Sequence, residues 1–273
     1  MRLPAATLAA CAALALLLPG EGAARQTVVA AVRSHAVAGV LHVRVVLPDG
    51  YAASGRRYPV VYFLHGLPAS PGSYLGNRWV DDALEAAGPA ILVFPQGARA
   101  SDPDAEYLNW GPGRDWETFV AEELPRQIDR RFRTIQARAG RALVGVSAGG
   151  YGAAILGLHH LGTFSVIESW SGYFHPTDPT GTKALARGPL TVAHSLISTL
   201  RRDRTRRPTF VGFYVGRSDA RFYPDNVQFD RELTTAGVRH TFAVYPGGHR
   251  TSLWQAHARA WLALALAHLA PAS

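Results

Sequence analysis

The sequence predicts an α/β protein in which a mostly parallel central sheet is covered by helices on both faces. The first observation is that short apolar runs, typical of buried strands, alternate along the chain with segments whose apolar residues recur at helical spacing. The second is that no internal repeat or low-complexity linker breaks this alternation, and strands joined through a helix pair in parallel. Together they predict a doubly wound sheet.

The bulk composition is that of one folded domain. The chain has 273 residues, of which 48% are hydrophobic and 18% charged, so it can bury a large core and is unlike a disordered chain. We expect residues 25–273 to form a single catalytic domain. Its net charge of +8 rests almost wholly on arginine, since Lys183 is the only lysine. No basic stripe with interleaved aromatic residues is present, so we expect no nucleic-acid partner.

One dense group of basic residues lies in the second half of the chain. We expect a solvated turn there, and the alternative is a contact with an anionic envelope or substrate. Its members are Arg201, Arg202, Arg204, Arg206 and Arg207.

Residues 1–24 have the layout of a signal peptide. Arg2 precedes an apolar run from Leu3 to Leu18, and small residues follow up to Ala24, where we place the cleavage. The protein is therefore expected to be secreted or associated with the cell envelope. The residues around Cys11 also resemble a bacterial lipobox, but the apolar run continues well beyond this cysteine, so a lipid anchor is the less favoured alternative.

The first half of the chain offers three strands. Residues 40–47 alternate apolar and polar side chains, which indicates a half-exposed antiparallel strand at the sheet edge. Residues 59–64 and 90–94 are apolar throughout, as in buried central strands. Residues 116–132 then have helical spacing, with Asp115 as the expected N-cap and a kink expected at Pro125.

The second half continues the alternation. Residues 174–208 form its one long interruption, and we expect them to be a cap or lid over a site. The expected strands are residues 142–146, 164–168, 210–215 and 240–245, and the expected helices are residues 148–160, 226–236 and 252–269.

A G-x-S-x-G motif at residues 145–149 stands where a buried strand gives way to a helix. On such a tight turn a serine hydroxyl projects from the carboxyl edge of the sheet, and the flanking glycines let neighbouring chain pass without a clash. The helix N-terminus also favours developing negative charge. Ser147 is therefore the candidate nucleophile.

A serine needs a base and an orienting acid, which follow it in this fold in the order acid and then histidine. His249 follows the strand at 240–245, and Asp219 follows the strand at 210–215, so both should reach the same sheet edge as Ser147. Asp225 is the alternative acid. His175 and His65 lie in loops near the site, but both precede the candidate acid and break the chain order.

An oxyanion formed on the ester carbonyl needs two backbone donors. We expect the N–H of Ala148, directly after the nucleophile, and that of Leu67, in the loop after the strand at 59–64. Histidine and aspartate are scattered without metal-ligand spacing, and there is no phosphate-binding glycine loop, so no metal or cofactor is expected.

Several residues near these loops are candidates for a substrate pocket, with core packing as the alternative. They are His65, Tyr74, Trp110, Trp170 and Trp254.

These motifs resemble the esterase-D group of α/β-hydrolases, which includes S-formylglutathione hydrolases, feruloyl and acetylxylan esterases, and secreted mycolyltransferases. The resemblance runs from about Val46 to Leu269. It is carried by YPVVYFLHGL at 58–67, NWGPGRDWETFVAEELP at 109–125, LVGVSAGGYGA at 143–153, VGRSD at 215–219 and YPGGH at 245–249.

The resemblance implies an α/β-hydrolase fold and an acyl-enzyme mechanism with Ser147, Asp219 and His249 as the triad and Leu67 and Ala148 as oxyanion donors. Mycolyltransferases usually carry a glutamate as the acid, and Asp219 in that place disfavours mycolyl transfer. We therefore expect a secreted serine carboxylesterase acting on small or polysaccharide-linked esters. The alternatives are an envelope acyltransferase and, less favoured, a non-catalytic envelope-binding relative.

Overall fold

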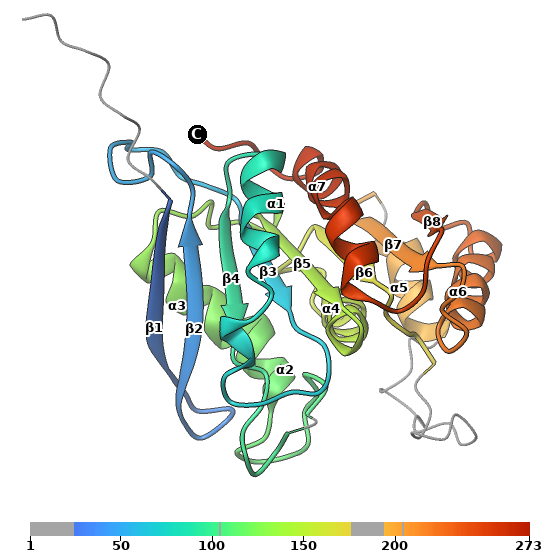
Figure 1. Cartoon of the computed structure of the whole chain (residues 1–273), viewed down its shortest axis with the longest axis horizontal. Helices are drawn as coiled ribbons and strands as arrows, with labels where there is room; N and C mark the ends of the chain where they lie inside the picture. Colours follow the sequence, from blue (N-terminus) through green and yellow to red (C-terminus); the bar gives the residue numbers. More distant parts are fainter. Residues whose placement is uncertain (1–24, 104, 176–193, 204) are drawn as a thin grey trace, which may run out of the picture.

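The computed structural model describes residues 25–103, 105–175, 194–203 and 205–273, and these build one eight-stranded sheet between layers of helices (Figure 1). The strand order is β1-β2-β4-β3-β5-β6-β7-β8. β3 to β8 run parallel, whereas β1 and β2 are antiparallel to their neighbours. The predicted α/β fold with a mostly parallel sheet is confirmed. The expected signal peptide and Cys11 lie outside the described residues.

The central strands lie where the uniformly apolar segments of the sequence predict them. β3 to β6 are almost entirely buried because helices cover both faces of this part of the sheet. The strands are β1 (Gln26–Ser34), β2 (Gly39–Leu47), β3 (Val60–Leu64), β4 (Ile91–Pro95), β5 (Arg141–Val146), β6 (Val166–Trp170), β7 (Phe210–Gly216) and β8 (Thr241–Tyr245).

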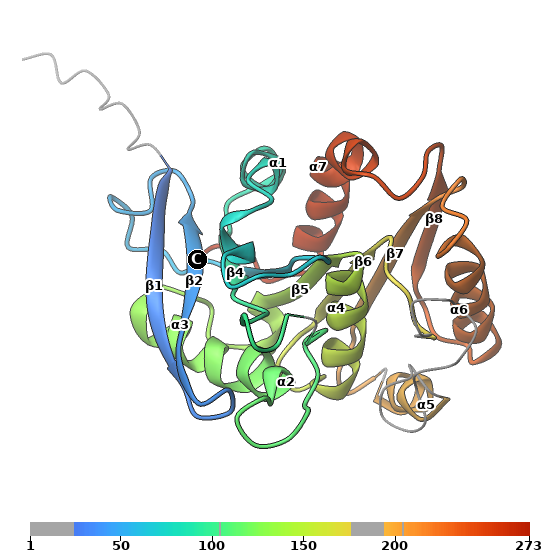
Figure 2. The ribbon, with the colours of Figure 1, turned by 60° about the horizontal axis from the view of Figure 1, so that its bottom comes forward.

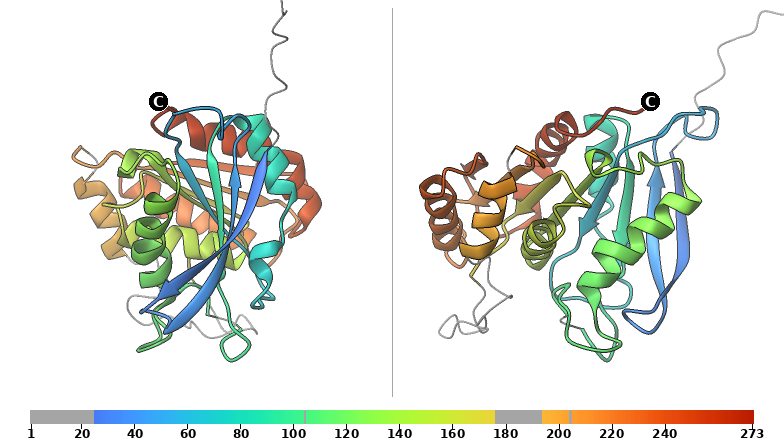
Figure 3. Two further views of the ribbon diagram at one scale, coloured as in Figure 1. Left: turned by 90° about the vertical axis from the view of Figure 1, so that its left-hand side faces the viewer. Right: turned by 180° about the vertical axis from the view of Figure 1, so that it is seen from behind.

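The edge position expected for residues 40–47 is wrong. This segment is β2, and β1 pairs with it over its whole length, from Gln26 opposite Leu47 to Ser34 opposite Gly39. β1 therefore occupies the edge, and β1 and β2 cross the near side in the left view of Figure 3. The outward residues of β1 are exposed, including Val29, as fits a strand with one solvated face.

The helices form two layers. α1 and α7 pack against each other on one face, and the remaining helices lie on the opposite face (Figure 2). Each face has its own apolar cluster, so the sheet is buried from both sides. The helices are α1 (Trp79–Ala87), α2 (Trp116–Thr118), α3 (Leu124–Arg131), α4 (Ala148–His159), α5 (His194–Asp203), α6 (Tyr223–Thr235) and α7 (Thr251–Ala267).

The helical stretch from Trp116 to Arg131 is continuous but contains a π-helical turn, η2, at Phe119–Glu123, immediately before Pro125. Proline lacks an N–H and crowds the carbonyl of the preceding turn, so a local widening accommodates it. Asp115 holds the N-cap position without capping the helix, because its Oδ1 accepts instead from the Gly111 N–H at 3.0 Å.

The region expected to be a cap is only partly described. Residues 176–193 lie outside the described residues, while residues 194–203 form α5, which packs against α4 on one face of the sheet. Ile197 and Leu200 of α5 are buried in the core of that face. α5 therefore belongs to the helical layer.

Candidate active site

Ser147 sits on a sharp turn between β5 and α4, with φ 58° and ψ −122°. Its N–H donates to the Trp170 carbonyl at 2.9 Å, which ties the turn to the end of β6. The motif glycines are required by close packing: a Cβ on Gly149 would lie 2.0 Å from the Leu64 oxygen, and one on Gly145 would lie 2.1 Å from the Gly149 oxygen. The strained turn therefore presents Ser147 at the carboxyl edge of the sheet.

Three predicted side chains meet at this edge. His249 Nε2 lies 2.9 Å from Ser147 Oγ, and His249 Nδ1 lies 2.7 Å from Asp219 Oδ2. Since an ionised carboxylate only accepts hydrogen bonds, the Asp219 contact places the proton on Nδ1 and leaves Nε2 to accept from the serine hydroxyl. Asp219 is 3% exposed, whereas the His249 side chain is 30% exposed.

The loops after β7 and β8 are bonded to each other, and this positions Asp219 and His249. The Ser218 N–H donates to the Gly247 carbonyl at 2.8 Å. A Cβ on Gly216 would lie 2.4 Å from the same Gly247 oxygen, so the two loops are in direct backbone contact. The second oxygen of Asp219, Oδ1, accepts from the Phe222 N–H at 3.2 Å.

The alternative acid, Asp225, is occupied elsewhere. Its side chain hydrogen-bonds to the ring of His175, and its Oδ2 accepts from the Phe174 N–H at 2.5 Å. This hydrogen bond to Asp225 raises the pKa of His175, against the opposing effect of burial. Asp225 and His175 therefore pair with each other, apart from Ser147 and His249.

The loop after β3 runs directly beside the serine. A Cβ on Gly66 would lie 2.9 Å from the Ser147 Cβ, so only glycine allows this approach. Leu67 follows Gly66 and is 40% exposed. Ala148 is the first residue of α4, where a backbone N–H has no acceptor within the helix. Both expected oxyanion donors thus belong to segments adjacent to Ser147.

Two aromatic rings flank the imidazole of His249. Phe222 lies at a centroid distance of 5.0 Å, and Trp254 lies at 5.2 Å with its ring nearly perpendicular to the imidazole. The indole N–H of Trp254 donates to Ser171 Oγ at 3.0 Å. Phe222 also stacks on Tyr173. Sequence reasoning missed Phe222 and Ser171, because nothing in their local pattern distinguishes them from other loop residues.

The other candidate pocket residues divide between surface and core. Trp110 is 46% exposed on a loop after β4, and Tyr74 is half-buried and stacks on His42. Trp170 is completely buried, so the core-packing alternative holds for it. His65 is 5% exposed with its Nδ1 3.0 Å from the Gly66 oxygen, and burial lowers its pKa.

A buried carboxyl group lies behind the site, on β6. Glu168 is completely buried and accepts hydrogen bonds from the Trp170 indole and the Tyr214 hydroxyl, each at 3.1 Å. Burial raises the pKa of Glu168 to about 8, although both hydrogen bonds act in the opposite direction. Glu168 is therefore mostly a neutral acid at pH 7.

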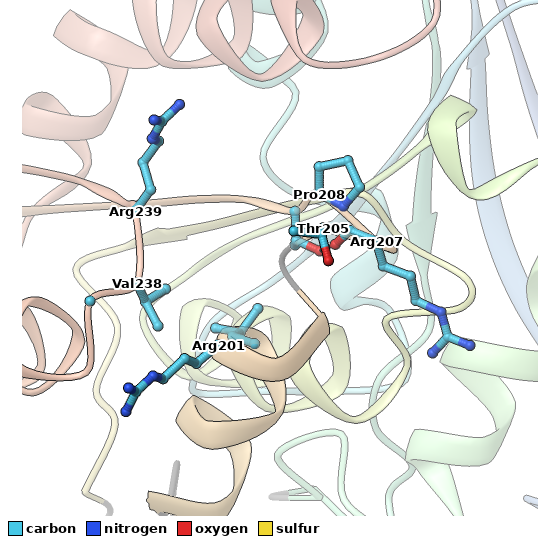
Figure 4. A pocket seen from close by; sticks show the side chains of 9 residues that line it. Arg201, Thr205, Arg207, Pro208, Val238 and Arg239 are labelled. Atoms are coloured by element: carbon cyan, nitrogen blue, oxygen red, sulfur yellow. The ribbon is translucent and has the colours of Figure 1, made fainter.

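A hollow of about 450 Å³ lies at the opposite edge of the sheet, before β7 and β8 (Figure 4). The side chains of Arg201, Arg207 and Arg239 border it, and their guanidinium groups point away from one another. It presents no converging donors and is separate from Ser147. Within the described ranges, no three histidine, cysteine or acidic side chains gather as metal ligands, and no helix has the length and apolar character to cross a membrane.

Comparisons with known proteins identify the family of the chain. Residues 34–263 match the family model described as "Putative esterase". Esterase Rv1288 of Mycobacterium tuberculosis is 39% identical over 137 residues, which are 48% of this chain and 28% of that protein. The MPT51/MPB51 antigen of Mycobacterium bovis is 32% identical over 148 residues, which are 52% of this chain and 46% of the antigen. The alignments thus span less than half of each relative.

The fold is also that of solved esterases. A ferulic acid esterase structure superposes with a TM-score of 0.72 at 23% identity, covering 90% of this chain and 99% of that one. The resemblance inferred from the sequence motifs is confirmed. Because the family model matches well over half of the chain, the protein belongs to the esterase family.

Proposed function

We propose that the protein is a serine carboxylesterase that hydrolyses acyl esters through an acyl-enzyme on Ser147. The observation that carries this proposal is the unbroken chain of hydrogen bonds from Ser147 Oγ through both nitrogens of His249 to Asp219. Serine is a weak nucleophile until a positioned base removes its proton, and this arrangement supplies the base and its orienting carboxylate.

In the proposed reaction, Ser147 Oγ attacks the ester carbonyl carbon while His249 Nε2 takes the hydroxyl proton. Collapse of the tetrahedral intermediate breaks the bond to the alcohol, which leaves with the proton from Nε2. A water molecule then gives its proton to Nε2 and attacks the acyl-enzyme, and the acid is released as Ser147 recovers its proton. Asp219 stabilises the imidazolium that forms in each half of the reaction.

The negative charge on the carbonyl oxygen is assigned to the backbone N–H groups of Leu67 and Ala148. The close approach of Gly66 to Ser147 supports the first donor, and the position of Ala148 at the start of α4 supports the second. Donors that are held in place before the reaction need no reorganisation as the charge develops, which is why such sites lower the barrier.

Water is the proposed acceptor of the acyl group. The His249 side chain is 30% exposed, so the imidazole that must deprotonate the attacking water is in contact with solvent. Transfer to a sugar of the cell envelope uses the same acyl-enzyme and differs only in the acceptor. The composition of residues 1–24 supports export to the compartment where polysaccharide-linked esters occur.

The proposal is tested with p-nitrophenyl esters of increasing acyl length, followed by release of p-nitrophenol and of free acid. We expect turnover by the wild-type chain and by Ser273→Ala, an exposed serine whose backbone is bonded to Arg57 before β3, at the opposite edge of the sheet, and none by Ser147→Ala. Equal release of alcohol and acid supports hydrolysis. Acylated sugar in place of free acid when a sugar is added would instead assign transfer, and a wild type without turnover would favour a non-catalytic binding protein.

A further inference from the structure

We propose that Trp254 and Ser171 are positioning residues that fix the imidazole of His249 relative to Ser147. The inference rests on the proposed function, since it concerns how the base of that reaction is held. It also revises the expectation that Trp254 lines the substrate pocket.

The end of β6 anchors both partners of the proton transfer. Trp170, the last residue of β6, accepts the Ser147 N–H at its carbonyl at 2.9 Å. Ser171, the next residue, accepts the Trp254 indole N–H at its Oγ at 3.0 Å. The nucleophile's backbone and the ring beside the base are therefore bonded to consecutive residues, so movement of either partner relative to the other would strain this segment.

Trp254, held by Ser171, in turn contacts the imidazole ring of His249. The indole and the imidazole are 5.2 Å apart and inclined at 86°, a preferred arrangement for aromatic pairs. Phe222 contacts the imidazole as well, at 5.0 Å. Both ring nitrogens of His249 are engaged by Ser147 and Asp219, so these two aromatic contacts restrict the remaining freedom of the ring.

Ser171 itself is held firmly. It is completely buried, its backbone has a φ of +49°, and its N–H donates to the Tyr214 carbonyl on β7 at 2.7 Å. A non-glycine residue in this region is strained and persists only where its surroundings fix it, as is common at functional sites. The acceptor for Trp254 therefore does not move freely with the indole.

The decisive experiment combines Trp254→Phe, which keeps a ring but removes the N–H, with Ser171→Ala, which removes the acceptor. We expect each to lower kcat for p-nitrophenyl ester hydrolysis by about 3- to 10-fold with KM unchanged. Because both remove the same hydrogen bond, the double variant should be no slower than the slower single variant. Trp254→Leu, which also removes the ring contact, should be slower than Trp254→Phe.

Trp261→Phe is the matched control, because it removes an indole N–H bond to Tyr245 from the same helix, α7. We expect it to lower the melting temperature without changing kcat. A second readout is the low-field proton NMR resonance of the His249 Nδ1–H, which should broaden in Trp254→Phe and Ser171→Ala and stay sharp in Trp261→Phe.

Three results would overturn the inference. A raised KM at unchanged kcat would show that Trp254 contacts the substrate instead of positioning His249. Additive losses of kcat in the double variant would show that Trp254 and Ser171 act separately. Unchanged kinetics in all variants would show that neither residue affects catalysis. The variants are also treated with a fluorophosphonate at Ser147. An unlabelled wild type refutes the proposed function, whereas a labelled wild type with unaffected variants refutes only the positioning role.

Discussion

His249 Nε2 lies 2.9 Å from Ser147 Oγ, although 102 residues separate the two in the chain. The sheet topology accounts for this contact, because β5, β7 and β8 are parallel and their carboxyl ends meet at one edge. The short loops after these strands then bring Ser147, Asp219 and His249 together. The same relationship yields predictions that do not depend on the identity of the natural ester.

Asp219 and Asp225 offer a direct comparison of the two candidate acids. We expect Asp219→Asn to lower kcat by about 10³-fold or more, because the amide cannot hold the imidazole in the required tautomer or stabilise its positive charge. Asp225→Asn should change kcat by less than about 3-fold, since that carboxylate pairs with His175. Steady-state hydrolysis of a p-nitrophenyl ester measures both, and the reverse order would assign the acid to Asp225.

Gly149 tests the packing of the nucleophile turn. A Cβ there would lie 2.0 Å from the Leu64 oxygen, and a backbone atom cannot yield as a flexible side chain does. We expect Gly149→Ala to reduce the free energy of unfolding by about 3 kcal/mol or to prevent folding. Gly162→Ala is the control, because nothing lies within 4 Å of its added Cβ. Urea unfolding of both variants checks the result, and equal stabilities would disprove the predicted clash.

Glu168 makes stability fall as pH rises. Its pKa is about 8 in the folded chain and 4.5 as the ordinary value, so its contribution is full below pH 4.5 and is lost as the pH rises to about 8. Glu168→Gln has no proton to lose. We expect it to melt roughly 5 °C or more above the wild type at pH 9, with the difference shrinking towards pH 5. A gap that is constant with pH would contradict this.

Glu117 should behave in the opposite way. Burial opposes its ionisation, but hydrogen bonds from His159 and His160 more than offset this, and the pKa of Glu117 falls to about 2. Its stabilising contribution is present above pH 4.5 and disappears as the pH falls through about 2. We expect Glu117→Gln to be less stable than the wild type at pH 6 and to approach it at pH 2. Thermal melts of both proteins between pH 2 and pH 6 measure this difference, and a difference that does not shrink towards pH 2 would contradict the prediction.

The sequence predicted the centre of the fold and the main site better than its surroundings. Uniformly apolar strands such as β3 and β4 have few alternative structures, and the G-x-S-x-G turn combines a residue motif with a strand-to-helix boundary. β1 was not predicted because its exposed side also carries the apolar residues Val29 and Ala31, so its alternation of apolar and polar residues is weak. α1 was not predicted either, although its apolar residues face the sheet.

The parts of the site that escaped prediction depend on tertiary contacts. Ser171 and Phe222 lie in loops whose local patterns are unremarkable, and their contacts with Trp254 and His249 arise only after the sheet has formed. Trp170 shows the converse error, since a tryptophan at the end of a strand beside the site points into the core. Sequence spacing alone does not specify to which side such a ring turns.

The most direct test of the account is to locate a covalent adduct by peptide mass spectrometry after treatment with a fluorophosphonate. The hydrogen-bonded chain through His249 predicts one adduct per chain, on the hydroxyl of Ser147, and a rate of labelling that falls sharply in His249→Gln. An unlabelled protein, or an adduct on any other residue, would contradict the central claim that Ser147 is the nucleophile.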